Sequence, residues 1–172
     1  MVLVYPLLMA SVGDRGSLAS RCLERAWARL REVEPCVPPV VIVLVPVGRK
    51  QGKLGHFSGL VWRAGRGERG HELAINPVLF DRPEDLLGTL VHEAAHALLF
   101  EWGLRGGCGP DGYFHREEFR GVCERLGLVC SFRNRRYGWS DTAWPVAGVP
   151  MKYRSVLRLL TRELPWGLRR PG

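Results

Sequence analysis

Residues 90–99 constrain this chain most, because they place two histidines and a glutamate inside an apolar helical run. The pattern is His-Glu-x-x-His, formed by His92, Glu93 and His96. At about 100° per residue, the two histidines lie about 40° apart on one helical face, with Glu93 at its edge. Random placement would give this pattern in about one such chain in a hundred, so chance is a weak explanation.

The apolar flanks of this run predict a buried helix, and a buried imidazole or carboxylate needs a partner. Desolvating such a polar group without one costs roughly 2–7 kcal/mol. Two imidazoles one turn apart can share a tetrahedral Zn²⁺ ion and leave a position for water. Glu93 can take a proton from that water and pass it to a leaving amine. We therefore expect a hydrolytic zinc site rather than surface histidines beside a solvated glutamate.

A catalytic zinc ion usually takes three protein ligands. The extended metzincin motif is excluded, because Leu99 and Trp102 stand where it requires glycine and histidine. The remaining candidates are His115 and the carboxylates of Glu117 and Glu118. We favour His115, because zinc prefers imidazole and the preceding glycine-rich loop lets the chain fold back. Glu118 could instead orient a ligand through a hydrogen bond.

Length and composition indicate a single domain over residues 1–172, with ordinary contents of 46% hydrophobic and 24% charged residues. No apolar run approaches the roughly 20 residues that cross a bilayer, so we expect no membrane association. The apolar N-terminus lacks a basic segment and contains Pro6, which argues against a signal peptide, and Met9 is an alternative start. Five cysteines without a Cys-x-x-Cys pair argue against a disulfide framework or zinc ribbon and favour the cytoplasm.

The hydrophobic pattern predicts an α+β fold with a core at about residues 15–142. Ser17 is the expected N-cap of the first helix, and Asp81 with Glu84 is the expected capping pair of the central helix, which Gly103 ends. The β-branched run at 40–45 indicates a central strand or one buried on both faces. Helices are predicted over 18–34, 81–102, 113–126 and 151–164, and strands over 40–45, 56–64, 71–75 and 128–132. These strands predict a small mixed or antiparallel sheet packed on helices.

The net charge of +8 permits a polyanionic partner such as DNA. Most of the basic residues are arginine, a bias that a GC-rich genome also produces. Basic loops occur at residues 48–53 and 133–136. Tyr137 and Trp139, which follow the second loop, could stack on unpaired bases or pack within the protein. DNA binding through these loops is therefore an open expectation.

Several segments match one family pattern: Asn76-Pro77, then residues 89–97, then His115-Arg116-Glu117-Glu118-Phe119 with a helix ending in Leu126-Gly127-Leu128. Together they resemble the SprT-like metallopeptidase domain, which eukaryotic Spartan proteases share. The likeness covers roughly residues 38–142, and residues 136–140 resemble the tail of small SprT-like proteins from actinobacteria and mobile elements.

This resemblance implies a zincin-like domain with the His-Glu-x-x-His helix at its centre. It implies zinc ligands at His92, His96 and His115 and a general base at Glu93. It also implies an edge strand, near residues 73–76, that pairs with a protein substrate in extended conformation. Association with DNA repair is less clearly implied, because the chain has no cysteine set for the C-terminal zinc ribbon that many SprT-like proteins carry.

The leading interpretation is a zinc-dependent endopeptidase that acts on protein, including DNA-associated protein. One alternative is an inactive or structural-zinc DNA-binding module, in which Cys108 would supply a fourth ligand. Another is a peptidase that cleaves a repressor in a mobile element. The sequence indicates neither the oligomeric state nor the group that stabilises an oxyanion, for which Tyr113 and Tyr137 are only candidates.

Overall fold

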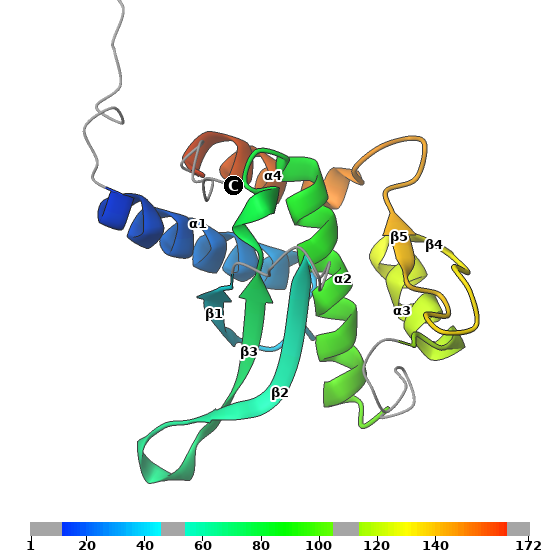
Figure 1. Cartoon of the computed structure of the whole chain (residues 1–172), viewed down its shortest axis with the longest axis horizontal. Coiled ribbons are helices and arrows are strands. Elements are labelled where there is room, and N and C mark those ends of the chain that lie inside the picture. Colours follow the sequence, from blue (N-terminus) through cyan, green and yellow to red (C-terminus); the bar gives the residue numbers. More distant parts are fainter. Residues whose placement is uncertain (1–11, 46–53, 105–113, 165–172) are drawn as a thin grey trace, which may run out of the picture.

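Helix α2 (Pro83–Glu101) lies between a three-stranded sheet and a smaller unit of one helix and a two-stranded hairpin (Figure 1). The computed structural model describes residues 12–45, 54–104 and 114–164. Ten of the nineteen residues of α2 are buried, because leucine, valine and alanine occupy most of its circumference. The fold is mixed α+β with small sheets, as predicted.

The main sheet contains β1 (Val40–Leu44), β2 (Gly55–Arg63) and β3 (Arg69–Ile75) in the order β1-β3-β2. Strand β1 is parallel to β3 and β2 is antiparallel to it, so the sheet is mixed, as predicted. The prediction of a central strand at residues 40–45 is wrong: β1 is an outer strand, and Val41 is 43% exposed. The prediction of an edge strand at residues 73–76 is also wrong, because β3 is central and β2 is the outer strand that packs beside α2.

Strand β2 carries a bulge. The pairing of β2 with β3 shifts register between Ser58 and Trp62, and Leu60 has a φ of +55°. Beyond the bulge, the hairpin extends away from the helices and turns through a 3₁₀ helix at Gly65–Gly67 (Figure 1). A bulge of this kind bends the strand and interrupts the regular pairing, which resumes at Trp62.

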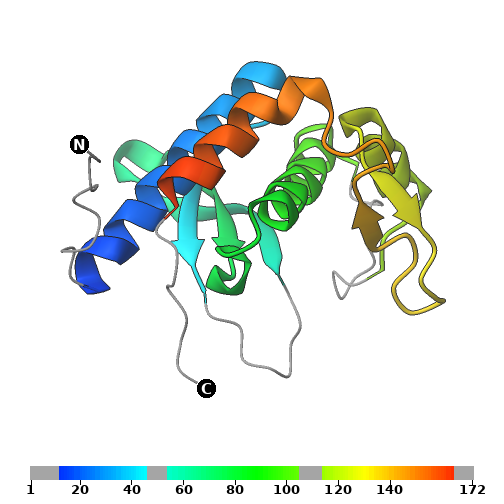
Figure 2. The ribbon, with the colours of Figure 1, turned by 90° about the horizontal axis from the view of Figure 1, so that it is seen from above.

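Helices α1 (Val12–Val33) and α4 (Arg154–Glu163) lie side by side over the sheet, and α4 also packs on α2 (Figure 2). Helix α1 begins before Ser17, so that residue is not its N-cap. The predicted last helix starts as a 3₁₀ turn (Met151–Tyr153) before α4. Tyr153 is fully buried, and its hydroxyl lies 2.9 Å from both Glu34 Oε1 and the Leu126 carbonyl oxygen.

Other helix boundaries correct the sequence predictions. A 3₁₀ turn (Pro77–Leu79) precedes α2, whose N-cap residue is Arg82 and not the expected Asp81. Gly103 follows the C-cap of α2 with a φ of +68°, as a helix-ending glycine should. None of the described helices is both long and apolar enough to cross a membrane.

The smaller unit contains α3 (Glu117–Leu126), β4 (Val129–Ser131) and β5 (Asp141–Ala143). Helix α3 starts later than predicted, and Gly127 ends it in the left-handed conformation, with a φ of +97°. Strand β4 confirms the short strand predicted at 128–132, whereas β5, its antiparallel partner, was not predicted. This unit packs against α2 on the side away from the sheet (Figures 1 and 2).

Candidate metal centre

Three imidazole rings converge beside α2. His92 and His96 are one turn apart on α2, and His115 comes from the segment just before α3. The Nε2 atoms of His92 and His96 are 3.3 Å apart, and those of His96 and His115 are 3.1 Å apart. The structure therefore brings together the three histidines that the sequence suggested as ligands.

The spacing of these nitrogen atoms fits a zinc ion. With a Zn–N distance of about 2.05 Å, two ligand atoms at the corners of a tetrahedron are about 3.3 Å apart. The two separations of 3.3 and 3.1 Å match that value closely. Among the described residues, the group has these three members, so they could supply three corners of a tetrahedron. Cys108, the suggested fourth ligand, lies outside the described residues, as does Tyr113.

His92 has a hydrogen-bond partner that the sequence did not reveal. Its Nδ1 atom lies 3.0 Å from the hydroxyl oxygen of Thr142, on β5. Burial, with a smaller contribution from nearby His115, lowers the pKa of His92 from 6.5 to about 3. The ring is therefore neutral at physiological pH, which is the form that binds a metal ion.

A backbone clamp fixes His115. Its N–H donates to the Tyr137 carbonyl at 3.0 Å, and its own carbonyl accepts from the Trp139 N–H at 2.9 Å. Between them, Gly138 has a φ of +62°, and a Cβ atom there would lie 2.1 Å from the His115 carbonyl oxygen. Only glycine fits this close approach, so the loop sequence Tyr137-Gly138-Trp139 determines where the third imidazole is placed.

Phe119 packs against all three histidine rings. It is fully buried in the first turns of α3, and its ring centroid lies 4.9, 4.4 and 4.3 Å from those of His92, His96 and His115. A rigid aromatic ring at these distances limits how far each imidazole can turn. His115 lies before α3, which begins at Glu117, so Phe119 reaches the three rings from the first turn of that helix.

The side chain of Glu93 extends from α2 to the outer edge of β2. Its carboxylate is nearly inaccessible, with the residue only 4% exposed, and Oε2 accepts a hydrogen bond from the Phe57 N–H at 2.9 Å. A Cβ atom at Gly55 would lie 2.9 Å from Oε1 and 2.7 Å from the methyl group of Thr89. Glu93 is not part of the group of three histidines that could hold a metal ion.

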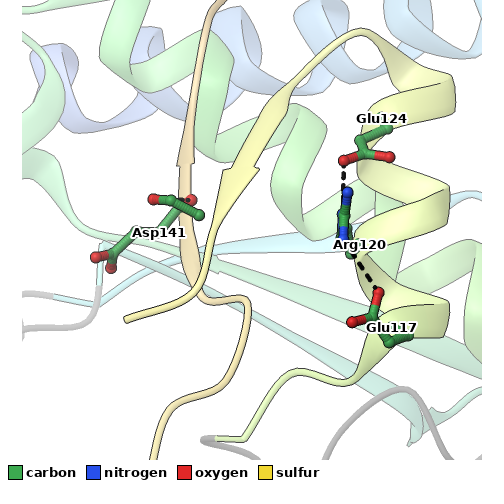
Figure 3. A network of polar contacts seen from close by, with 5 residues as sticks. Glu117, Arg120, Glu124 and Asp141 are labelled. Carbon is green, nitrogen blue, oxygen red and sulfur yellow. Dashed lines mark hydrogen bonds and ion pairs between the residues drawn. The ribbon is translucent and has the colours of Figure 1, made fainter. Parts of the chain in front are cut away.

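The carboxylate alternatives do not join this cluster. Glu117 and Glu118 are exposed on α3. Arg120 forms ion pairs with Glu117 at 3.4 Å and with Glu124 at 2.7 Å along the same helix (Figure 3). These contacts are surface pairs of the i,i+3 and i,i+4 type and contribute little to stability. His115 is therefore the third ligand candidate that the geometry favours.

The aromatic residues near the basic loop pack within the protein. Trp139 contacts Phe132 at a centroid distance of 5.5 Å, and Arg120 stacks on the Trp139 ring at 4.2 Å. Arg133 stacks on the Tyr137 ring at 4.7 Å. These contacts favour the packing role over base stacking. The other basic loop, residues 48–53, lies outside the described residues.

Comparisons with protein-family models, with curated proteins and with solved structures find no match to this chain. The chemistry of the site therefore has to be inferred from its own residues. They supply three closely spaced imidazole nitrogens, two of them from α2, and a buried carboxylate that is also on α2. Nitrogen ligands in this geometry suit zinc better than magnesium or calcium, which prefer oxygen.

Proposed function

We propose that this chain is a zinc-dependent endopeptidase with a zincin-like, SprT-like arrangement. In this proposal His92, His96 and His115 hold the ion, and Glu93 is the general base. The observation that carries the proposal is the spacing of the three Nε2 atoms, 3.3 and 3.1 Å, beside a helix that also buries a carboxylate. A structural site would have no need of that carboxylate, which disfavours the alternative of an inactive DNA-binding module.

A bound zinc ion would supply Lewis acidity, polarising the substrate carbonyl and making a water molecule more acidic. Glu93 would accept the proton of the attacking water and donate it to the leaving amine. The Phe57 N–H, at 2.9 Å from Oε2, holds one carboxylate oxygen in place. Burial keeps His92 neutral, so its nitrogen lone pair remains available for the ion.

The protein substrate would bind in extended conformation along β2. This strand is an outer strand of the sheet, and it packs beside α2. The N–H of Phe57 points to Glu93, so the outer edge of β2 faces the candidate site. A peptide that adds to this edge by backbone hydrogen bonds would therefore run past the general base.

DNA binding is part of this proposal because α4 carries an exposed row of arginines. Arg154, Arg158 and Arg162 follow one another at four-residue intervals on α4, and all three are exposed. The apolar face of α4 is already buried in the core, which leaves the arginine face outward. Phosphate contacts made by arginine carry no sequence information, so we expect any DNA binding to be unspecific and sensitive to salt.

The test combines zinc content with cleavage of casein and histone, measured with and without single-stranded DNA. Glu93→Gln should keep stoichiometric zinc and lose about 10²–10⁴-fold in cleavage rate, because the proton carrier is removed. Glu118→Gln is the matched control, since Glu118 is exposed and outside the cluster. Undiminished cleavage by Glu93→Gln would refute the assigned mechanism, and wild-type protein without zinc would refute the metal site.

A further inference from the structure

Strand β5 brings a hydroxyl group to the metal ligands from a distant part of the sequence. Thr142 is the central residue of β5 and pairs with Cys130 on β4. Its Oγ1 atom lies 3.0 Å from Nδ1 of His92, which is 50 residues earlier in the chain. The contact is partly buried, so water competes with it less than at an exposed site.

This contact has a consequence for the proton on His92. A neutral imidazole carries one N–H, and the nitrogen that binds a metal ion must be the other one. In the cluster, Nε2 of His92 is the atom that faces His96 at 3.3 Å, so with a metal ion bound there the proton of the neutral ring would be on Nδ1. An Nδ1–H that donates to Thr142 Oγ1 selects this tautomer and fixes the plane of the ring.

The position of Thr142 is itself well fixed. Three successive residue pairs join β5 to β4. Just after β5, the indole N–H of Trp144 donates to the Glu84 carbonyl in the first turn of α2 at 3.1 Å. The hairpin is thus attached to the same helix that carries His92. The Thr142 hydroxyl is on a short side chain of this hairpin, so the backbone of β5 sets its position beside the His92 imidazole.

We propose that Thr142 is a positioning residue for the metal centre, which sets the tautomer and orientation of His92 and thereby the affinity for zinc. The inference rests on the proposed function, since it assumes that His92 is a zinc ligand. The loop before β5 already clamps His115 through Gly138. The segment from Tyr137 to Thr142 would therefore position two of the three ligands, although it lies outside the His-Glu-x-x-His motif.

The experiment measures equilibrium zinc affinity by competition with a chromophoric chelator. Thr142→Val keeps the shape of the side chain and removes the hydroxyl, and it should weaken zinc binding by about 10–100-fold. Thr142→Ser keeps the hydroxyl and should remain within about threefold of the wild type. Thr161→Val is the matched control, because the Thr161 hydroxyl bonds to a carbonyl within α4, far along the chain from the cluster.

Thermal unfolding of the proteins after a chelator has removed their metal shows whether the variants fold. A Co²⁺ spectrum reports the ligand geometry without any cleavage assay. Loss of affinity in Thr142→Val together with its retention in Thr142→Ser would support the inference. Wild-type affinity in Thr142→Val, or an equal loss in Thr142→Ser, would overturn it and leave the proposed function intact. Absence of zinc binding in the wild type would overturn the proposed function and this inference with it.

Discussion

Replacing Gly138 with alanine should damage the candidate metal centre, although Gly138 is not one of the three histidines. Gly138 has a φ of +62°, and the added Cβ would lie 2.1 Å from the His115 carbonyl oxygen. That oxygen cannot move alone, because it accepts a hydrogen bond from the Trp139 N–H at 2.9 Å, while the His115 N–H donates to Tyr137 at 3.0 Å. The collision must therefore shift the backbone of His115 or open the clamp.

The expected cost has two parts. A left-handed conformation costs a residue with a Cβ about 1–2 kcal/mol. Opening the two hydrogen bonds of the clamp costs about 0.5–1.5 kcal/mol each. Together these estimates give a loss of about 2–5 kcal/mol in the free energy of unfolding. Because His115 is displaced, zinc affinity should also fall.

Gly148→Ala is the matched control. Gly148 has a φ of +83°, but a Cβ atom there would meet nothing within 4 Å. This variant should therefore lose only the conformational part, about 1–2 kcal/mol, and keep its zinc affinity. Denaturant unfolding of both variants without metal gives the two free energies, and chelator competition gives the two affinities. Equal losses in the two variants, or unchanged zinc affinity in Gly138→Ala, would refute the role of the clamp.

Three further measurements test other parts of the structure. In metal-free protein, His92 has a pKa near 3, so as the pH falls below 6.5 the unfolded chain takes up a proton on this imidazole before the folded protein does. The free energy of unfolding should therefore fall by about 1.4 kcal/mol for each pH unit between 6.5 and 3. An unchanged denaturation midpoint between pH 7 and 5 would contradict this. Burial raises the pKa of the Cys22 thiol to about 12, so an alkylating reagent should modify exposed Cys36 in the folded protein and Cys22 only after unfolding, as peptide mapping would show. Tyr153→Phe leaves the Leu126 carbonyl without its hydroxyl partner and should cost about 1–3 kcal/mol in denaturant unfolding without changing zinc affinity.

Local sequence patterns predicted much of this molecule. The apolar run around His92 and His96 predicted a buried helix, because helical periodicity and ligand spacing are both set within a few residues. The third ligand candidate, His115, could be proposed because one more imidazole lay a short loop away. The position of β1 within the sheet was predicted wrongly, because a β-branched run indicates β propensity and not the number of neighbouring strands.

The supports of the site could not be predicted in the same way. Strand β5 has three residues, too few for an alternating pattern to be recognised, and Thr142 reaches His92 across 50 positions. Gly138 did carry a signal, because a glycine between Tyr137 and Trp139 suggests a close backbone approach. The sequence could not show that the backbone it approaches is that of His115. Likewise, the contact between Phe57 and Glu93 depends on how β2 packs against α2.

The bulge in β2 has a consequence for the way copies of this chain meet. An outer strand with unpaired backbone groups is a template for edge-to-edge aggregation, and Val61 and Trp62 add exposed apolar surface there. The break in register after Ser58 leaves no long flat ladder for a second copy to extend. Pairing resumes at Trp62 and Arg63, and the longer regular part, from Gly55 to Ser58, is the part beside Glu93. Self-association through this longer part would therefore occupy the same short edge as a substrate of the proposed enzyme, so the two would exclude each other there.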